Sequence, residues 1–249
     1  MPKSAALARS LMICRLCEKD APLMKSHIIP EFLYSSMYDE KHRFHELSTN
    51  ESKKNKFYQK GVTEKLLCGD CEQKLSKHER YASLFLNGGA QITYRLSGNF
   101  VIAEGLEYTS FKLFGLSILW RASVSSLNMF NQVILGSHEE SLRKMILHEN
   151  PGKEDDYPFV MFPIICEGAV LQDLIMQPEI TKVDGCNAYR FVFGGNAWVF
   201  IVSNYRAPDA FISASISEAG ALTMIPKRLE DMKFIVDMAQ DLYRKGKVQ

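Results

Sequence analysis

The sequence lacks the features that define several large classes of protein. Its 249 residues carry 30 Lys and Arg against 29 Asp and Glu, so the net charge of +1 provides no overall field that attracts nucleic acid or a membrane surface. It contains no internal repeat, no low-complexity tract and no glycine-rich phosphate-binding loop. The most apolar run, residues 111–119, is too short to span a bilayer. These absences predict a globular protein that does not enter a membrane.

The chain also lacks the marks of a secreted protein. Residues 1–12 include one Lys and one Arg but no uninterrupted apolar segment, so no secretory signal is recognised. Six cysteines in a chain of this length are too few for a disulfide scaffold. Cys166 and Cys186 lie far apart in apolar or turn-like surroundings, and we expect both to be buried free thiols. Reduced thiols without an export signal predict a cytoplasmic location.

Two Cys-x-x-Cys pairs are the strongest feature of the chain: Cys14 with Cys17, and Cys68 with Cys71. Each tight turn presents two thiolates, and four thiolates satisfy one tetrahedral zinc ion. The intervening segment of about 50 residues is tolerated because loop-closure entropy grows slowly with length, and metal binding offsets it. A thioredoxin-like redox pair would open a helix in a βαβ unit and would not need a second pair. The sequence therefore predicts one structural Zn²⁺.

The segments around these pairs predict short elements. Apolar periodicity and Gly/Pro positions indicate a helix or arm over residues 1–13, an extended segment over 24–29, a short helix beginning at 31, a strand over 65–67 and a helix over 71–86. Between them, residues 38–60 are polar and predict a solvated, mobile loop.

That polar loop carries four lysines that can neutralise phosphates: Lys53, Lys54, Lys56 and Lys60. Residues 1–95 hold 16 Lys and Arg against 11 Asp and Glu, whereas the remainder holds 14 against 18. This asymmetry is compatible with nucleic acid as a partner of the N-terminal part. A charge run in a loop is nevertheless more often only a solvated surface.

The composition predicts an α+β protein in which a zinc-binding module over residues 1–88 precedes a second α+β domain over residues 89–249 with an antiparallel sheet. The longest expected helix, over 108–127, is apolar nearly all round. It therefore belongs in the core, with only Lys112 and Arg121 at solvent-facing edges.

The rest of the second part alternates between helix and strand patterns. Ser137 and Glu140 have the spacing of a capping box at the start of a helix over 138–147. Gly194-Gly195-Asn196 predicts a hairpin turn between strands over 189–193 and 197–202. Further strands are expected over 100–103, 159–166, 210–215 and 222–225, with a last helix over 227–245.

The order Cys-x-x-Cys, then Ser26-His27-Ile28-Ile29-Pro30, then Leu-Cys-x-x-Cys leading into a helix resembles the HNH endonucleases, the ββα-metal group with a treble-clef zinc module. The resemblance covers about residues 12–85. It implies that His27 is the general base, activating water for attack on a nucleic-acid phosphodiester. It also implies that one Mg²⁺ or Mn²⁺ stabilises the scissile phosphate and the leaving oxygen. An imidazole suits this role because it titrates near neutrality.

The chain departs from the family pattern at three positions. Before the base, where the family has Asp or His, stands Ser26, a poor metal ligand. After the last cysteine, where the family has Asn or His, stands Glu72, a competent ligand for a hard cation. The family's middle Asn has no equivalent, since Thr63 and Glu64 occupy that place. The candidate catalytic residues are therefore His27 and Glu72.

Two functions remain open. The first is a metal-dependent nuclease, with residues 89–249 selecting substrate, docking a protein partner or forming a homodimer. The second is a non-catalytic zinc module that binds nucleic acid or protein, in which His27 is structural. Convergence of Glu72 and His27 favours the first, whereas a Glu72 that faces solvent or pairs with Lys favours the second. His78, further along the same helix, is expected to face solvent.

Overall fold

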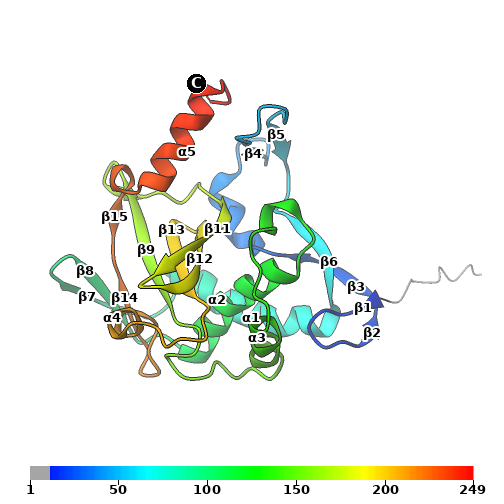
Figure 1. The fold of residues 1–249 in the computed structure, drawn as a ribbon, viewed down its shortest axis with the longest axis vertical. Helices are drawn as coiled ribbons and strands as arrows, with labels where there is room; N and C mark the ends of the chain where they lie inside the picture. The colour runs from blue at the N-terminus through cyan, green and yellow to red at the C-terminus, as the bar shows by residue number, and fades with distance from the viewer. Residues whose placement is uncertain (1–11, 249) are drawn as a thin grey trace, which may run out of the picture.

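The computed structural model describes residues 12–248 and has a mixed α+β architecture built on a nine-stranded sheet (Figure 1). The expected class, α+β, is confirmed. The helix or arm expected over residues 1–13 lies almost wholly outside the described residues. In the described part of the chain, no helix combines the length and apolarity needed to cross a bilayer.

The N-terminal part consists of small paired elements followed by a helix. β1 (Met12–Ile13) pairs with β2 (Asp20–Ala21), and β3 (Leu23–His27) pairs antiparallel with β6 (Thr63–Cys68). The chain passes directly from β6 into α1 (Gly69–Leu86), which buries a stripe that includes Leu75, Ala82 and Phe85. The extended segment, strand and helix expected from the sequence are confirmed here.

The segment between β3 and β6 is more ordered than its composition indicates. A 3-10 helix, η1 (Glu31–Met37), follows Pro30, and β4 (Phe44–Glu46) and β5 (Lys56–Tyr58) form an antiparallel hairpin. The stretch is largely exposed, as expected, but it contains a β-hairpin instead of only a loop. Phe44 is buried and packs against Tyr34, with ring centroids 5.2 Å apart, so one apolar side chain anchors a mostly polar hairpin.

The large sheet has the strand order β11-β12-β13-β9-β14-β8-β7, and two short strands, β10 and β15, also pair with β9. β9 runs parallel to β14 and β15, while the other neighbours are antiparallel, so the sheet is mixed. The strands are β7 (Thr93–Ser97), β8 (Phe100–Glu104), β9 (Phe159–Cys166), β10 (Ala169–Val170), β11 (Met176–Val183), β12 (Cys186–Phe193), β13 (Asn196–Ile201), β14 (Ala221–Met224) and β15 (Lys227–Arg228).

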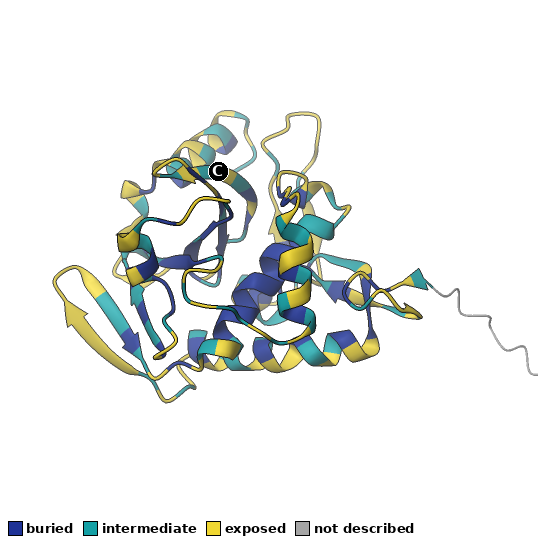
Figure 2. Cartoon of the chain, turned by 60° about the horizontal axis from the view of Figure 1, so that its bottom comes forward, coloured by how far each residue is buried: buried dark blue, intermediate teal, exposed yellow. Residues whose placement is uncertain are grey.

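α2 (Tyr108–Val124) is the centre of the molecule. Figure 2 shows this helix almost entirely buried, and every residue from 111 to 122 is buried. Its aromatic side chains pack on the sheet, where Phe111 lies 5.8 Å from Trp198 between ring centroids. A Cβ at Gly115 would lie 2.8 Å from the Phe159 ring, so glycine permits this close approach.

α2 packs against the sheet on one side and against α1 and α3 (His138–Leu147) on the other. On the opposite face of the sheet, Ile235 of α5 (Lys233–Arg244) clusters with Ile164 and Val192, so α5 covers part of that face. Strand residues alternate between these two layers, as successive side chains of a strand do. The main core cluster includes residues from both sides of position 88, among them Cys14, Leu75, Phe111 and Trp198. The boundary between residues 88 and 89 stays a prediction.

Several sequence predictions differ from the structure. Lys112 and Arg121 are buried rather than at solvent-facing edges. Ser137 has helical backbone angles (φ −63°, ψ −20°) and makes no capping hydrogen bond, so the capping box is absent. A strand was expected over residues 210–215, but residues 209–214 form a helix, α4 (Asp209–Ala214). Pro208 precedes this helix, and its carbonyl accepts the Ile212 N–H. The last helix begins at Lys233, after β15 and the short 3-10 helix η3 (Leu229–Asp231). A further 3-10 helix, η2 (Asn128–Phe130), follows α2.

Candidate metal centre

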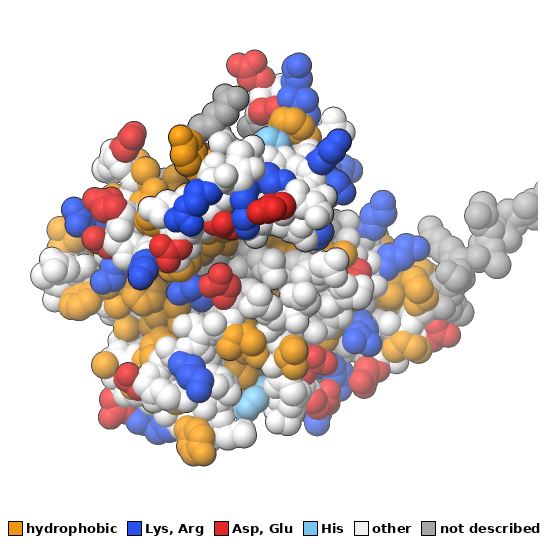
Figure 3. All heavy atoms as spheres, turned by 45° about the horizontal axis from the view of Figure 1, so that its top comes forward, with side chains coloured by type: hydrophobic (Ala, Val, Ile, Leu, Met, Phe, Trp, Pro, Cys, Tyr) orange, Lys and Arg blue, Asp and Glu red, His pale blue; other side chains and the backbone are white. Residues whose placement is uncertain are grey.

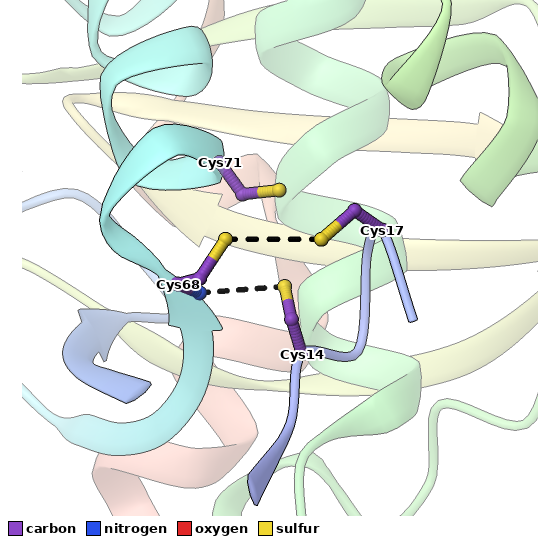
Figure 4. A group of neighbouring side chains, drawn as sticks. All are labelled: Cys14, Cys17, Cys68 and Cys71. Carbon is purple, nitrogen blue, oxygen red and sulfur yellow. Dashed lines mark hydrogen bonds between the residues drawn. The ribbon is translucent and has the colours of Figure 1, made fainter. Parts of the chain in front are cut away.

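Two turns bring the four cysteines of the N-terminal part together (Figure 4). Cys14 and Cys17 lie in the turn between β1 and β2, Cys68 ends β6, and Cys71 lies in the first turn of α1. All four Sγ atoms lie within 4.8 Å of one another, and Cys17 Sγ is 3.7 Å from Cys68 Sγ. The structure therefore gathers the four residues that the sequence predicted as metal ligands.

The spacing of these sulfurs matches the demands of zinc. A tetrahedral ion with Zn–S bonds of about 2.3 Å separates its sulfur ligands by about 3.8 Å. The Cys17–Cys68 distance of 3.7 Å agrees with this edge, and the remaining separations are close enough for a shared ion. In the part of the chain that the structure describes, no other group of three or more His, Cys, Asp or Glu side chains comes this close together. Cys166 and Cys186 are free thiols, as expected, but only Cys186 is buried and Cys166 is partly exposed.

The backbone holds the first turn in place against β6. Cys14 donates its N–H to the Lys19 carbonyl (2.9 Å), and Glu18 adopts a left-handed conformation with φ of 60° to close the turn. Arg15 donates to the Leu66 carbonyl (3.0 Å), which ties the turn to the strand that carries Cys68. The cysteine geometry therefore depends on the β1–β2 hairpin as well as on the helix.

The protein environment shifts the thiol pKa values in opposite directions. Burial raises the pKa of Cys68 and, far more strongly, that of Cys71. Burial acts on Cys14 in the same sense, but backbone N–H groups of Cys17, Cys68 and Leu16 outweigh it and lower the Cys14 pKa. Because metal ligation requires thiolates, binding of a cation would release the protons that burial retains.

His27 ends β3 close to a carboxylate that the sequence analysis did not identify. Its Nε2 lies 2.8 Å from Glu31 Oε2, and its side chain is 28% exposed. The Glu31 carboxylate also accepts hydrogen bonds from the Tyr38 hydroxyl and from the Gly61 N–H (3.0 Å). Burial and the Glu31 carboxylate raise the pKa of Tyr38, so its hydroxyl stays a donor. The only sequence signal for this pair is the spacing of four residues between His27 and Glu31.

Within residues 12–248, Glu72 neither converges with His27 nor pairs with a lysine, the arrangements that would distinguish the two functions. It bonds to Ser26 instead. The Ser26 hydroxyl donates a hydrogen bond to the Glu72 carboxylate and accepts one from the Leu67 N–H (3.1 Å). Ser26 is fully buried, whereas the adjacent His27 side chain is partly exposed, because neighbouring strand residues point to opposite faces. The hydrogen bond with Ser26 fixes Glu72 at the start of α1.

Thr63 and Glu64, which stand where the resemblance would place an Asn, make structural contacts. Thr63 faces His27 across the β3–β6 pair. Glu64 accepts hydrogen bonds from the Ser125 hydroxyl (2.7 Å) and the Ser126 N–H (3.0 Å), just after α2 ends. Glu64 thereby links β6 to α2.

Arg121 is a second link that the sequence analysis missed. Its Nη1 donates to the His27 carbonyl (2.7 Å) and lies 2.8 Å from Glu79 Oε1 on α1. Its Nε donates to the Ser117 carbonyl (3.2 Å). The buried guanidinium therefore joins the end of β3 to two helices.

His78, on α1, is buried instead of facing solvent as expected. It is 3% exposed, and its Nε2 lies 3.5 Å from Glu149 Oε1. Burial lowers the pKa of His78, and Lys77 adds to this effect while Glu149 opposes it. Both ring nitrogens are buried without a hydrogen-bond partner, which favours the neutral imidazole.

No protein-family model, curated protein or solved structure matches this chain. The functional argument therefore rests on the cysteine site, on His27 and on the elements that hold them.

Proposed function

We propose that the protein is a metal-dependent nuclease of HNH type that hydrolyses nucleic-acid phosphodiesters, with a structural zinc on the four cysteines and His27 as general base. The observation that carries the proposal is the placement of His27. This residue ends a strand whose partner, β6, carries Cys68 at its end and leads directly into α1, which carries Cys71. A β3–β6–α1 unit with two cysteine turns is what a treble clef of this family requires.

The His27–Glu31 contact suits a proton acceptor. His27 Nε2 is buried 2.8 Å from Glu31 Oε2, although the two atoms are not aligned as a hydrogen bond. A proton on Nε2, beside the carboxylate, would leave the lone pair on Nδ1. That nitrogen can take a proton from water as the water oxygen attacks phosphorus. The bond from phosphorus to the leaving oxygen then breaks, and the leaving oxygen takes a proton from solvent. Glu31 holds the ring and offsets the positive charge that develops on it.

Glu72 is the candidate ligand for a Mg²⁺ or Mn²⁺ ion distinct from the zinc. Its carboxylate is the kind of ligand that these hard cations prefer, and the Ser26 hydroxyl fixes its position. Such an ion would supply charge stabilisation at the scissile phosphate.

The second candidate function is a zinc module that binds nucleic acid or protein without cleaving it. It is favoured by the hydrogen bond between Glu72 and Ser26, which occupies the carboxylate within the fold. Under this alternative, His27 is structural, in close contact with Glu31, and no cleavage exists to abolish.

The test compares wild type with His27→Ala in cleavage of plasmid and single-stranded substrates, with Mg²⁺, Mn²⁺ or EDTA. We expect His27→Ala to lose about 10²–10⁴-fold in rate, with zinc content and melting temperature nearly unchanged. Glu72→Ala should behave similarly, with partial rescue at high Mn²⁺. His138→Ala is the matched control, since its ring also has one polar partner, the Tyr157 hydroxyl at 3.1 Å. It should cleave like wild type.

Equal residual cleavage by wild type and His27→Ala would indicate a contaminant and would reject the nuclease. A lowered melting temperature for His27→Ala, with no cleavage by either protein, would favour the non-catalytic zinc module.

A further inference from the structure

The β4–β5 hairpin has two aromatic faces, and the fold uses only one of them. On the inner face, Phe44 packs against Tyr34 and Tyr38, with centroid distances of 5.2 and 5.9 Å. Its cross-strand partner, Tyr58, stacks on it at 5.8 Å. These contacts anchor the hairpin to η1.

The outer face carries a second stack that supports nothing in the core. His45 and Phe57 are paired across the strands, and their rings lie 4.3 Å apart at an interplanar angle of 3°. The Arg43 guanidinium lies 4.5 Å from the Phe57 ring centroid. Two hydrogen bonds to Asp39 (2.8 and 3.0 Å) hold the guanidinium plane in this position. Phe57 is nonetheless 56% exposed.

Lysines lie along this hairpin, and two more come from the far end of the chain, where Lys245 also pairs with Asp241. Lys53, Lys54, Lys56 and Lys60 are all exposed along the hairpin. Lys56, opposite Glu46, shares the inner face with Tyr58, so Lys53, Lys54 and Lys60 are the ones available to the outer face. Lys245, at the end of α5, donates to the Thr49 carbonyl (2.7 Å), and Lys247 donates to the Lys53 carbonyl. These contacts join the C-terminal lysines to the hairpin loop, although nearly 200 residues separate them in sequence.

The figures show this arrangement at one end of the molecule. α5 and the β4–β5 hairpin project side by side in Figure 1. Figure 3 turns this end toward the viewer, and several Lys and Arg side chains lie around it, with acidic side chains among them. Exposed π surfaces within basic surroundings fit a ligand that has both bases and phosphates.

We propose that the outer face of the β4–β5 hairpin binds single-stranded nucleic acid. Bases stack on the Arg43–Phe57–His45 column, and the lysines of the hairpin and of the α5 end contact phosphates. Unpaired bases offer a free face to aromatic and guanidinium planes, whereas the bases of a duplex are stacked on one another. The proposal rests on the proposed function, because it names the form of the substrate that the nuclease would receive.

The hairpin is also tied to the proposed catalytic residue. Gly61, three residues after β5, donates its N–H to Glu31 Oε2 (3.0 Å), and the same oxygen lies 2.8 Å from His27. The chain that leaves the hairpin therefore contacts the carboxylate beside His27.

The experiment measures binding separately from cleavage. Full-length protein is titrated, without added Mg²⁺ or Mn²⁺, into fluorescein-labelled poly-dT and poly-rU oligonucleotides and a duplex, each of about 20 nucleotides or base pairs. A second probe carries 2-aminopurine, whose fluorescence falls when the base stacks. The variants are Phe57→Ala, the conservative Phe57→Tyr, and Phe100→Ala as a matched control, since Phe100 is an aromatic 43% exposed on the separate β7–β8 hairpin.

We expect single strands to bind more tightly than duplex. Phe57→Ala should weaken single-strand binding about tenfold or more and abolish the 2-aminopurine signal, whereas Phe57→Tyr and Phe100→Ala should bind like wild type. Changing Lys53 and Lys54 together to Gln should reduce the log–log salt slope by about 0.7 for each phosphate that the variant no longer neutralises. Tighter binding of the DNA or the RNA probe identifies the natural ligand.

Undiminished binding by Phe57→Ala, equal binding of duplex and single strand, or no binding at low salt would overturn the proposal. Binding through Phe57 without any cleavage would reject the nuclease and leave the hairpin site standing. Cleavage that is unaffected by Phe57→Ala, with unchanged affinity, would reject the hairpin site and leave the nuclease standing.

Discussion

His78 is a single residue whose burial has a consequence for stability. The side chain packs within the α1 contacts, near Glu149 and beside two lysines, Lys74 and Lys77. Burial lowers its pKa below the ordinary value of 6.5. In the unfolded chain the imidazole takes up a proton more readily. Protonation therefore stabilises the unfolded state relative to the folded state as the pH falls below 6.5.

We therefore expect the contribution of His78 to be fully present above pH 6.5 and to be lost progressively as the pH falls below it. A tenfold difference in proton affinity between the two states is worth about 1.4 kcal/mol. The measurement is the free energy of unfolding by urea between pH 7.5 and pH 5, for wild type and His78→Phe. Wild type should lose more stability than the variant on acidification. Parallel curves for the two proteins would contradict this expectation.

Arg121 and Lys112 show why charge could not be placed from the apolar pattern of α2. Each buried cation has at least one polar partner that lies far away in the sequence. Lys112 donates to the Tyr108 hydroxyl (2.9 Å) and to the Lys153 carbonyl, and burial lowers its pKa to about 8. A helical pattern gives the direction of a side chain but not the carbonyl or carboxylate that another segment brings to it.

At the scale of elements, Arg121 connects α2 with α1 and with the end of β3. Its guanidinium contacts Glu79 Oε1 at 2.8 Å and the His27 carbonyl at 2.7 Å. We expect Arg121→Met to lower the free energy of unfolding by about 3–5 kcal/mol, because Glu79 and the carbonyl lose their partner. The double variant with Glu79→Met should recover part of this loss. Urea denaturation of the four proteins of the cycle checks both expectations.

The zinc content of Arg121→Met is the control. Of the four cysteines only Cys71 lies on an element that Arg121 contacts, so the variant should still bind the metal. A change of less than about 1 kcal/mol for Arg121→Met would mean that the buried pair is not a link between these elements.

Elements with a long apolar pattern were predictable from sequence, and elements stabilised by distant contacts were not. α1, α2, α3 and the β12–β13 hairpin are confirmed because periodicity or a glycine turn specifies each of them locally. The β4–β5 hairpin depends on Phe44 meeting Tyr34 and on lysines from the α5 end, which no local pattern encodes. α4 has only six residues, too few for periodicity to separate helix from strand.

The candidate site divides in the same way. The Cys-x-x-Cys spacing predicted four ligands that do lie together, because two short turns fix each pair locally. Glu31, Arg121 and the Glu72–Ser26 hydrogen bond were not predicted. Each depends on how η1, α2 and α1 pack around β3, which is tertiary information.

At the scale of the whole molecule, the cysteine cluster belongs to the main core. The cluster that contains Cys14, Cys68 and Cys71 is continuous with Phe111 of α2 and Trp198 of the sheet. Loss of the metal should therefore be felt well beyond the two cysteine turns. Without a cation, the four cysteine side chains would be partly protonated, and no bound ion would hold this part of the core together.

We expect purified protein to contain about one zinc per chain and Cys68→Ser to contain none. A loss of about 3 kcal/mol or more would lower the melting temperature by roughly 6–12 °C in a chain of this size. Cys186→Ser is the matched control, because Cys186 is also buried but lies on β12, in a different cluster. It should keep its zinc. Metal analysis and calorimetry of the three proteins provide the measurements.

The shape of the melting curve then separates two descriptions of the chain. If residues 12–248 unfold as one unit, Cys68→Ser shifts a single transition. If residues 1–88 unfold independently, wild type shows two transitions, and the variant lowers only the one that belongs to the zinc module. A stable, fully folded wild-type protein without zinc would reject the metal centre itself, since four thiols within 4.8 Å of one another, three of them buried, would then need no cation.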